Sequence, residues 1–161
     1  MLDEQTLALA AKTVATLRAK GVRVVTAESC TGGLIAAALT HMAGSSDVVA
    51  GGFVTYSNAL KESALGVAAH TLATEGAVSE ATAIEMAMGA LTAASDAKIA
   101  VAVTGIAGPD GGTDNKPVGT VCLAIQSGDA APTVETQHFP GDRAAIRTAT
   151  VRRALELLSA S

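Results

Sequence analysis

Three short apolar segments, each followed by a loop of small and polar residues, constrain the fold of this chain more than any other feature. They are rich in β-branched residues, as buried strands are, and span residues 22–26 (VRVVT), 48–56 (VVAGGFVTY) and 99–103 (IAVAV). The first leads through Gly32 and Gly33 into the helical stretch 34–42. This order of strand, turn and helix predicts an α/β fold.

Capping residues and periodicity predict the remaining elements. Asp3 begins a first helix that ends at Gly21, and Ser79 and Asp142 begin two later helices. We also expect a short helix over 58–65, a connector over 72–76, a strand over 118–125 and an edge strand over 133–138. The chain shows no linker or repeat, so residues 1–161 are expected to form a single domain. We predict a three-layer α/β/α sandwich around a mostly parallel or mixed sheet of about five strands.

The composition argues against several classes of protein. The net charge is −4 and aromatic residues make up 2%, so the basic surplus and the stacking faces used in nucleic-acid binding are missing. No run of about 18 apolar residues is present, and the acidic start of the chain does not resemble a secretory signal. Cys30 and Cys122 do not make a disulfide framework. We therefore expect a cytoplasmic protein with reduced thiols that binds neither nucleic acid nor membrane.

Ser29 is the first candidate for chemistry. In open α/β sheets ligands bind at the carboxyl ends of strands, and Ser29 lies between such an end and a helix start. Free amides at a helix start can hold an oxyanion, and a serine there is a nucleophile if a base reaches it. The alternative is that Ser29 or Thr31 only caps the helix. We expect the neighbouring Cys30 to be buried and inert.

Lys61 is the best candidate for that base. His41, His70 and His138 are isolated from one another and from the cysteines, so we expect surface histidines and no metal. A lysine is a base when it is neutral, and burial or a nearby positive charge such as Arg143 lowers its pKa. The alternative is a solvated surface lysine.

Two further features point to a ligand. Arg143 lies in the first turn of the last predicted helix, where the helix dipole disfavours a cation unless Asp142 or a bound phosphate offsets it. The loop 104–113 has neither a Walker motif nor a dinucleotide fingerprint. Its glycines still allow close approach of a ligand, although a plain surface loop is the alternative.

Six separated segments share their order and spacing with a known family. They are 27–33 (AESCTGG), 56–61 (YSNALK), 76–79 (GAVS), 104–112 (TGIAGPDGG), 116–119 (KPVG) and 141–143 (GDR). In these segments the chain closely resembles the CinA carboxyl-terminal domain family, the nicotinamide-nucleotide amidases, in its stand-alone form. The resemblance extends from about residue 3 to about residue 158, which is nearly the whole chain.

The resemblance implies hydrolysis of nicotinamide mononucleotide to nicotinic acid mononucleotide and ammonia, a step of pyridine-nucleotide recycling, without a metal or cofactor. It implies that Ser29 is the nucleophile, Lys61 the general base and Tyr56 an assistant in proton transfer or substrate placement. The implied substrate contacts are Thr31, Gly32, Gly33, Asn58, Thr104, Gly105 and Arg143, with the amides around residues 31–33 holding the oxyanion. We also expect a homo-oligomer. The alternative function is a non-catalytic nucleotide-binding module linked to competence or DNA damage.

Overall fold

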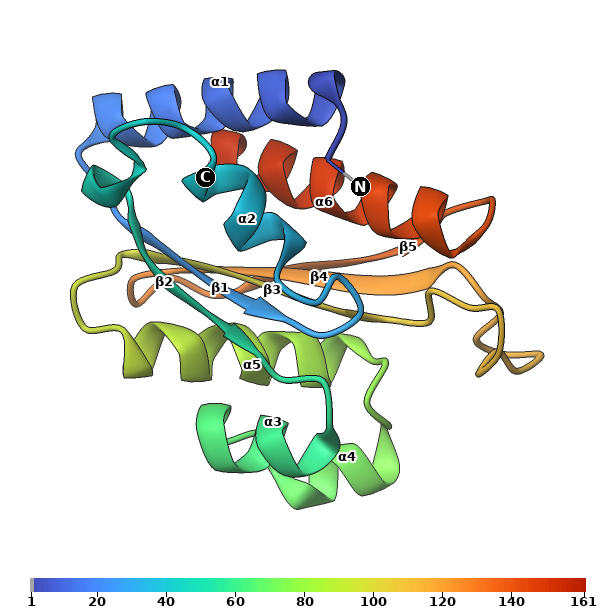
Figure 1. The fold of residues 1–161 in the computed structure, drawn as a ribbon. Coiled ribbons are helices and arrows are strands. Elements are labelled where there is room, and N and C mark those ends of the chain that lie inside the picture. Colours follow the sequence, from blue (N-terminus) through green and yellow to red (C-terminus); the bar gives the residue numbers. More distant parts are fainter. Residues whose placement is uncertain (1) are drawn as a thin grey trace.

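The computed structural model describes residues 2–161, and a central sheet lies between two layers of helices (Figure 1). One face of the sheet is covered by α1 (Glu4–Lys20), α2 (Leu34–Thr40) and α6 (Arg143–Ala160). The other face is covered by α5 (Glu80–Ala93), beyond which lie α3 (Asn58–Leu65) and α4 (Ala69–Thr74). A short 3-10 helix, η1 (Ser45–Asp47), precedes the second strand. The predicted three-layer α/β/α sandwich is confirmed.

The sheet has five strands in the order β2-β1-β3-β4-β5. β1 (Val24–Glu28) pairs in parallel with β2 (Val49–Val54) and with β3 (Ile99–Gly105). β4 (Thr120–Ser127) is antiparallel to β3 and to the edge strand β5 (Thr133–His138). The sheet is therefore mixed, and its three parallel strands bring their carboxyl ends to one edge of the molecule.

Local capping sets the helix bounds as the sequence predicts. Asp3 accepts a hydrogen bond from the Thr6 amide at 2.9 Å, and Gly21 ends α1 in the left-handed conformation with φ +66°. Asp142 caps α6 by accepting from the Ala145 amide at 2.9 Å. These caps explain why α1 and α6 begin where the sequence places them.

The predicted connector over 72–76 is wrong, because α4 occupies Ala69–Thr74. No residue of α4 itself caps its first turn. Glu85 of α5 does so by accepting from the Ala68 amide at 2.7 Å and from the Thr71 hydroxyl at 2.6 Å. A cap supplied from another helix leaves no signal in the local sequence.

The predicted strands need shifts of one or two residues at their ends. β1 runs over Val24–Glu28 instead of 22–26, β2 over Val49–Val54 instead of 48–56, and β4 over Thr120–Ser127 instead of 118–125. The shift of β1 has a physical cause. Glu28 continues the strand because the amides of α2 satisfy its buried carboxylate.

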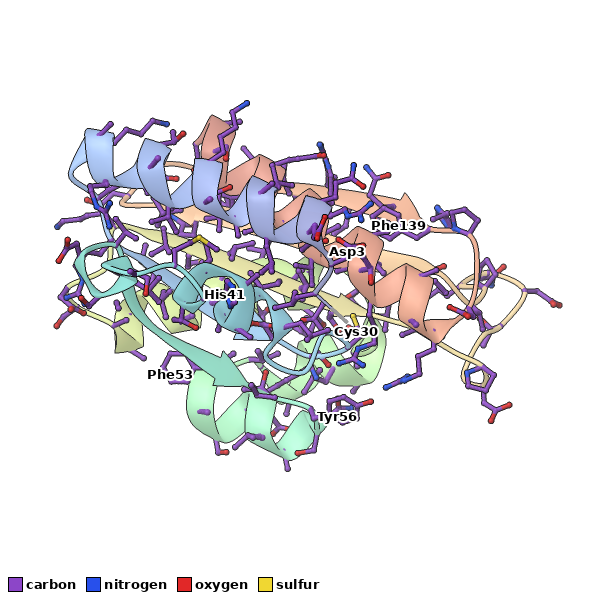
Figure 2. The ribbon with its side chains drawn as sticks, turned by 45° about the horizontal axis from the view of Figure 1, so that its top comes forward. Asp3, Cys30, His41, Phe53, Tyr56 and Phe139 are labelled. Carbon is purple, nitrogen blue, oxygen red and sulfur yellow. The ribbon has the colours of Figure 1, made fainter. Side chains whose placement is uncertain are left out.

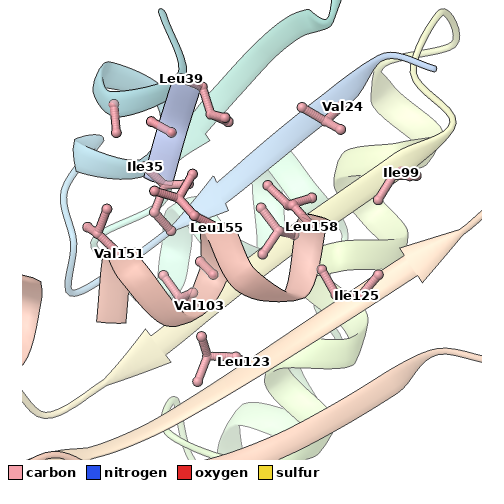
Figure 3. Close-up of a cluster of buried hydrophobic side chains, with 14 of the residues drawn as sticks. Val24, Ile35, Leu39, Ile99, Val103, Leu123, Ile125, Val151, Leu155 and Leu158 are labelled. Atoms are coloured by element: carbon pink, nitrogen blue, oxygen red, sulfur yellow. The ribbon is translucent and has the colours of Figure 1, made fainter. Parts of the chain in front are cut away.

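The two faces of the sheet are packed with side chains of different size. The face under α1, α2 and α6 carries branched residues such as Val24, Val103 and Leu123, which pack against Ile35 and Leu155 (Figure 3). The face under α5 is built largely from alanine, with Ala27, Ala100, Ala102 and Ala124 of the sheet in one cluster with Ala83, Ala87 and Ala90 of α5. Small side chains on both surfaces let α5 lie close to the sheet.

Candidate functional site

The site forms where β1 and β2 end. Ser29 directly follows β1, and its amide donates to the carbonyl oxygen of Val103 in β3 at 3.0 Å. Thr55 directly follows β2, and its amide donates to the carbonyl oxygen of Glu28 at 2.9 Å. These bonds continue the sheet pairing past the strand ends, so Ser29 and Thr55 are held beside each other on a rigid support.

Lys61 reaches this point from α3. Ser57 caps that helix by accepting from the Leu60 amide at 3.2 Å, which places Lys61 in its first turns. The residue is only 1% exposed, and its Nζ lies 3.1 Å from Oγ of Ser29 and donates to the carbonyl oxygen of Thr55 at 2.8 Å. Among residues 2–161 no carboxylate forms an ion pair with it. The alternative of a solvated surface lysine is therefore wrong.

Burial lowers the pKa of Lys61 from its ordinary value of 10.5, because the charged form has lost its hydration. Arg143, the expected second cause, instead donates from Nη1 to the carbonyl oxygen of Gly108 at 2.9 Å and from Nη2 to the hydroxyl of Tyr56 at 3.0 Å. A lysine with a lowered pKa that contacts a serine hydroxyl has the arrangement of a base next to its nucleophile.

Glu28, which is not among the predicted site residues, holds the turn that carries Ser29. Its carboxylate is fully buried and accepts four hydrogen bonds, from the Thr31 hydroxyl at 2.7 Å and from the amides of Gly33, Ile35 and Ala36 at 2.9, 3.1 and 2.8 Å. Gly33 occupies the N-cap position of α2 without a side-chain cap. The alternative that Ser29 or Thr31 caps this helix is wrong, because Glu28 satisfies its free amides.

The amides of the turn are divided between structural bonds and free donors. The Gly32 amide donates to the Ser29 carbonyl oxygen at 3.0 Å, and the Gly33 amide donates to Glu28. Both amides are therefore engaged inside the turn in this structure, and their part in holding an oxyanion stays a prediction. The amides of Cys30 and Thr31 have no partner elsewhere among residues 2–161. Glycine is required at 32 and 33 because both residues have positive φ, at +60° and +93°.

Tyr56 lies at the surface, in the segment between β2 and α3 (Figure 2). Its side chain is exposed, and its hydroxyl accepts the hydrogen bond from Arg143. Arg143 is the first residue of α6, so this contact joins the two helix starts across the site. The predicted grouping of Tyr56 and Arg143 in one site is consistent with this contact.

Three predicted substrate contacts are differently placed. Thr104 is buried, and its hydroxyl donates to the Ala77 carbonyl oxygen at 2.6 Å. Gly105 allows β3 and β4 to approach, because a Cβ there would lie 2.8 Å from Cγ2 of Val121. Asn58 is exposed at the start of α3. Contact of these residues with a substrate stays a prediction.

Cys30 is not a competing nucleophile. It is buried, and burial raises the pKa of its thiol to about 11, so it stays protonated at neutral pH. Cys30 and Cys122 are both free, and the three histidines are exposed, as expected (His41 is labelled in Figure 2).

Within residues 2–161 no three His, Cys, Asp or Glu side chains come together as metal ligands would. No helix in that range combines the length and the apolar character that a membrane span needs.

A surface cavity of about 670 Å³ lies away from these residues. Its lining includes Met88 of α5, Lys98 before β3 and Gln126 near the end of β4, which places it at the opposite end of the sheet. None of the candidate residues lines it. The candidate site is therefore identified by the chemistry of Ser29 and Lys61 and not by the size of a surface cavity.

Glu28 and Arg147 lie at the site and are not among the residues predicted from the sequence. Glu28 carried a signal, as a charged residue between an apolar strand and a helix start. Arg147 lies four residues after Arg143 and so on the same face of α6, and its Nη2 donates to the carbonyl oxygen of Thr31 at 2.9 Å. Both residues hold the turn that contains Ser29, one from each side.

Comparison with known proteins agrees with this arrangement. The family described as the CinA C-terminal domain matches residues 6–161. The nicotinamide-nucleotide amidohydrolase PncC of Escherichia coli (strain K12) is 47% identical over 158 residues, which cover 98% of this chain and 95% of that protein. The protein of the same name from Enterobacter agglomerans is 56% identical over 133 residues, covering 83% and 80%.

A solved structure shows the same fold over nearly the full length of both chains. The crystal structure of the competence/damage inducible protein CihA from Agrobacterium tumefaciens superposes with a TM-score of 0.95 at 50% identity, covering 99% of this chain and 97% of that one. With a family match over almost every residue and relatives of similar length, the chain belongs to the family of CinA C-terminal domains.

Proposed function

We propose that this domain hydrolyses the carboxamide of nicotinamide mononucleotide to nicotinic acid mononucleotide and ammonia, as a step in the recycling of pyridine nucleotides. The observation that carries the proposal is the contact of 3.1 Å between Nζ of Lys61 and Oγ of Ser29, in a buried setting without a carboxylate partner. The printed name of the Escherichia coli and Enterobacter relatives, nicotinamide-nucleotide amidohydrolase, supports the choice of substrate.

Acyl transfer begins at Ser29. Neutral Lys61 accepts the proton of the Ser29 hydroxyl, while one of its own N–H groups keeps its bond to the Thr55 carbonyl oxygen. Oγ then attacks the carboxamide carbon and forms a tetrahedral intermediate with a negative oxygen. The amides of Cys30 and Thr31 have no other partner in residues 2–161, which supports them as the donors that stabilise that oxygen.

Lys61 returns the proton in the second half of the step. Its ammonium protonates the departing nitrogen, which leaves as ammonia, and Ser29 is left as an ester with the nicotinoyl group. Water then loses a proton to neutral Lys61 and attacks the ester. The ammonium of Lys61 returns that proton to Oγ of Ser29 as nicotinic acid mononucleotide departs, which restores both residues. One base therefore serves both halves of the reaction.

Tyr56 and Arg143 act on the substrate side of the site. The hydroxyl of Tyr56 is exposed and accepts from Arg143, which supports placement of the substrate as its role. The Arg143 side chain extends from the start of α6 to the Gly108 carbonyl oxygen of the glycine loop. This contact connects the proposed substrate side to the loop 104–112.

The experiment is release of ammonia from nicotinamide mononucleotide by the wild-type chain and by Ser29→Ala. We expect Ser29→Ala to lower kcat by roughly 10³-fold or more and to leave the fold unchanged. Ser46→Ala is the matched control, because Ser46 is exposed in η1 and lies outside the site. Full activity of Ser29→Ala would refute the assignment of the nucleophile.

The wild-type chain itself separates the proposal from its alternatives. Binding of nicotinamide mononucleotide in a calorimeter without any ammonia would identify a nucleotide-binding module in place of an enzyme. Faster release of ammonia from free nicotinamide or from another amide would support the roles of Ser29 and Lys61 but identify a different substrate.

A further inference from the structure

The arginines of this chain fall into two groups. Four of the six form ion pairs with carboxylates, namely Arg18, Arg23, Arg152 and Arg153. Arg143 and Arg147 form none within residues 2–161, although the chain as a whole is acidic. Both unpaired arginines lie in the first two turns of α6, beside the candidate site.

Each of the two is held by a different loop of the site. Arg143 donates to the Gly108 carbonyl oxygen, in the loop after β3, and Arg147 donates to the Thr31 carbonyl oxygen, in the loop after β1. Because their positions differ by four residues, the two guanidinium groups project from one face of the helix. They therefore bracket the space between the two loops with two positive charges.

Arg147 keeps unused hydrogen-bonding capacity. Its Nε is buried and has no partner within residues 2–161, as is also true of Arg23, but Arg23 has its charge balanced by Asp96 and Arg147 has no such carboxylate. The guanidinium lies against the glycine turn, since a Cβ on Gly32 would be 3.5 Å from its Nη2. A purely structural arginine would gain from a carboxylate here, and residues 2–161 place none against it.

We infer that Arg143 and Arg147 together form the subsite for the dianionic phosphate of the substrate, an inference that rests on the proposed function. Guanidinium groups match phosphate oxygens in charge and in bidentate geometry. The amino-terminal end of α6 adds the positive end of its helix dipole at the same place. The nearest acidic side chain on that helix, Asp142, is engaged in capping the Ala145 amide.

The test compares a substrate with the phosphate and one without it. Arg147→Met is assayed on nicotinamide mononucleotide and on nicotinamide riboside, with Arg152→Met as the control that removes a paired arginine from the same helix. We expect Arg147→Met to lower kcat/KM for the nucleotide about 10- to 100-fold more than kcat/KM for the riboside, because a charged hydrogen bond to phosphate is lost with the nucleotide alone, whereas any loosening of the Ser29 turn acts on both substrates. Arg152→Met should affect the two substrates equally.

The comparison of the two substrates also tests the alternative role of Arg147, which is to position the Ser29 turn. If the residue only positions the Ser29 turn through the Thr31 carbonyl oxygen, both substrates lose activity by the same factor, and the phosphate subsite is refuted. Where turnover of the riboside is too slow to compare, calorimetric binding of the product nicotinic acid mononucleotide decides. A Kd at least 10-fold weaker in Arg147→Met supports the subsite, and an unchanged Kd overturns it.

Folding and the proposed reaction are controlled separately. Thermal unfolding of each variant establishes that it is folded, and Arg143→Met repeats the test from the other side of the subsite if Arg147→Met does not fold. A wild-type chain that releases no ammonia would refute the proposed function. In that case weaker binding of the nucleotide to Arg147→Met still tests the subsite by itself.

Discussion

Nζ of Lys61 lies 3.1 Å from Oγ of Ser29, although 32 residues separate them in the chain. The contact brings together the end of β1 and the first turns of α3, and both residues are almost fully buried. A cation in such a place is costly unless it is neutral or paired. The cost is a reason to regard this lysine as functional, since burial alone gives it the lowered pKa that a base requires.

Activity should depend on pH through Lys61. Because burial lowers the pKa of Lys61 below 10.5, the neutral base forms as pH rises through a value below that figure. We expect kcat/KM for nicotinamide mononucleotide to rise with pH along a limb whose midpoint lies below 10.5. A profile of kcat/KM between pH 5 and pH 11 measures it. An ascending limb centred at or above 10.5 would contradict the role of Lys61 as base.

Lys61→Met should abolish activity and still give a stable protein. Methionine fills the apolar path of the lysine stem without a charge to desolvate, so we expect an unchanged or higher Tm together with a loss of kcat of roughly 10³-fold. Differential scanning calorimetry and the ammonia assay measure the two effects. Lys12→Met, at an exposed position of α1, is the control, and a Tm well below that of the control would show that the lysine stabilises the fold.

The stability gap between Lys61→Met and the wild type should depend on pH with a definite sign. In the wild type the folded-state pKa of Lys61 is below its unfolded value of 10.5, so the unfolded chain binds more protons between these two values. The free energy of unfolding of the wild type therefore rises with pH in that window relative to the variant. Urea unfolding at several pH values tests the sign. A free energy of unfolding of the wild type that falls with rising pH relative to the variant would be inconsistent with a lowered pKa.

Glu28→Gln should damage the fold and the site together. The amide places an NH₂ group against donors that now share a carboxylate, so we expect the free energy of unfolding to fall by roughly 1–3 kcal/mol and kcat to fall as the Ser29 turn loosens. Urea unfolding and ammonia release measure the two quantities. Glu62→Gln, on the exposed side of α3, should change neither, and equal behaviour of the two variants would show that the Glu28 charge is unimportant.

Gly89→Ala should separate α3 from α5. A Cβ at Gly89 would lie 1.8 Å from the carbonyl oxygen of Leu65, the last residue of α3, so the helices must move apart. We expect a loss of roughly 1–3 kcal/mol in the free energy of unfolding, in spite of the better helix propensity of alanine. Activity should fall too, because α3 carries Lys61. Gly51→Ala is the control, since no atom lies within 4 Å of a Cβ there, and a stable, active Gly89→Ala would show that the crossing is loose.

The elements that the sequence predicts correctly are those with local signals. Asp3, Ser79 and Asp142 each accept a hydrogen bond from an amide three residues later, so their helix starts can be read without knowledge of the fold. α4 was missed because its cap, Glu85, comes from α5. The end of β1 was misplaced for the same reason, since Glu28 belongs in a strand only when α2 is folded over it.

For the candidate site, too, the sequence predicts the features with local signals and not those that depend on the folded structure. Ser29 and Lys61 were weak candidates from residue type and position, and only the resemblance to a family joined them before their contact was seen. The sequence does not show that the amides of Gly32 and Gly33 are used inside the turn, because their partners take up their positions only in the folded protein. Arg147 is distinguished only by the folded structure, in which it has no ion pair whereas four other arginines do.

The carboxylate of Glu28 ties the end of β1 to the start of α2 and so joins the strand, the turn that carries Ser29 and the helix into one unit. The amides of Ile35 and Ala36 that bind it can exchange with solvent only when this unit opens, and that opening also displaces Ser29. Slow hydrogen exchange at these two amides would then report how rarely Ser29 leaves its place beside Lys61. In this domain, the protection of a helix start measures the population of the proposed reactive geometry.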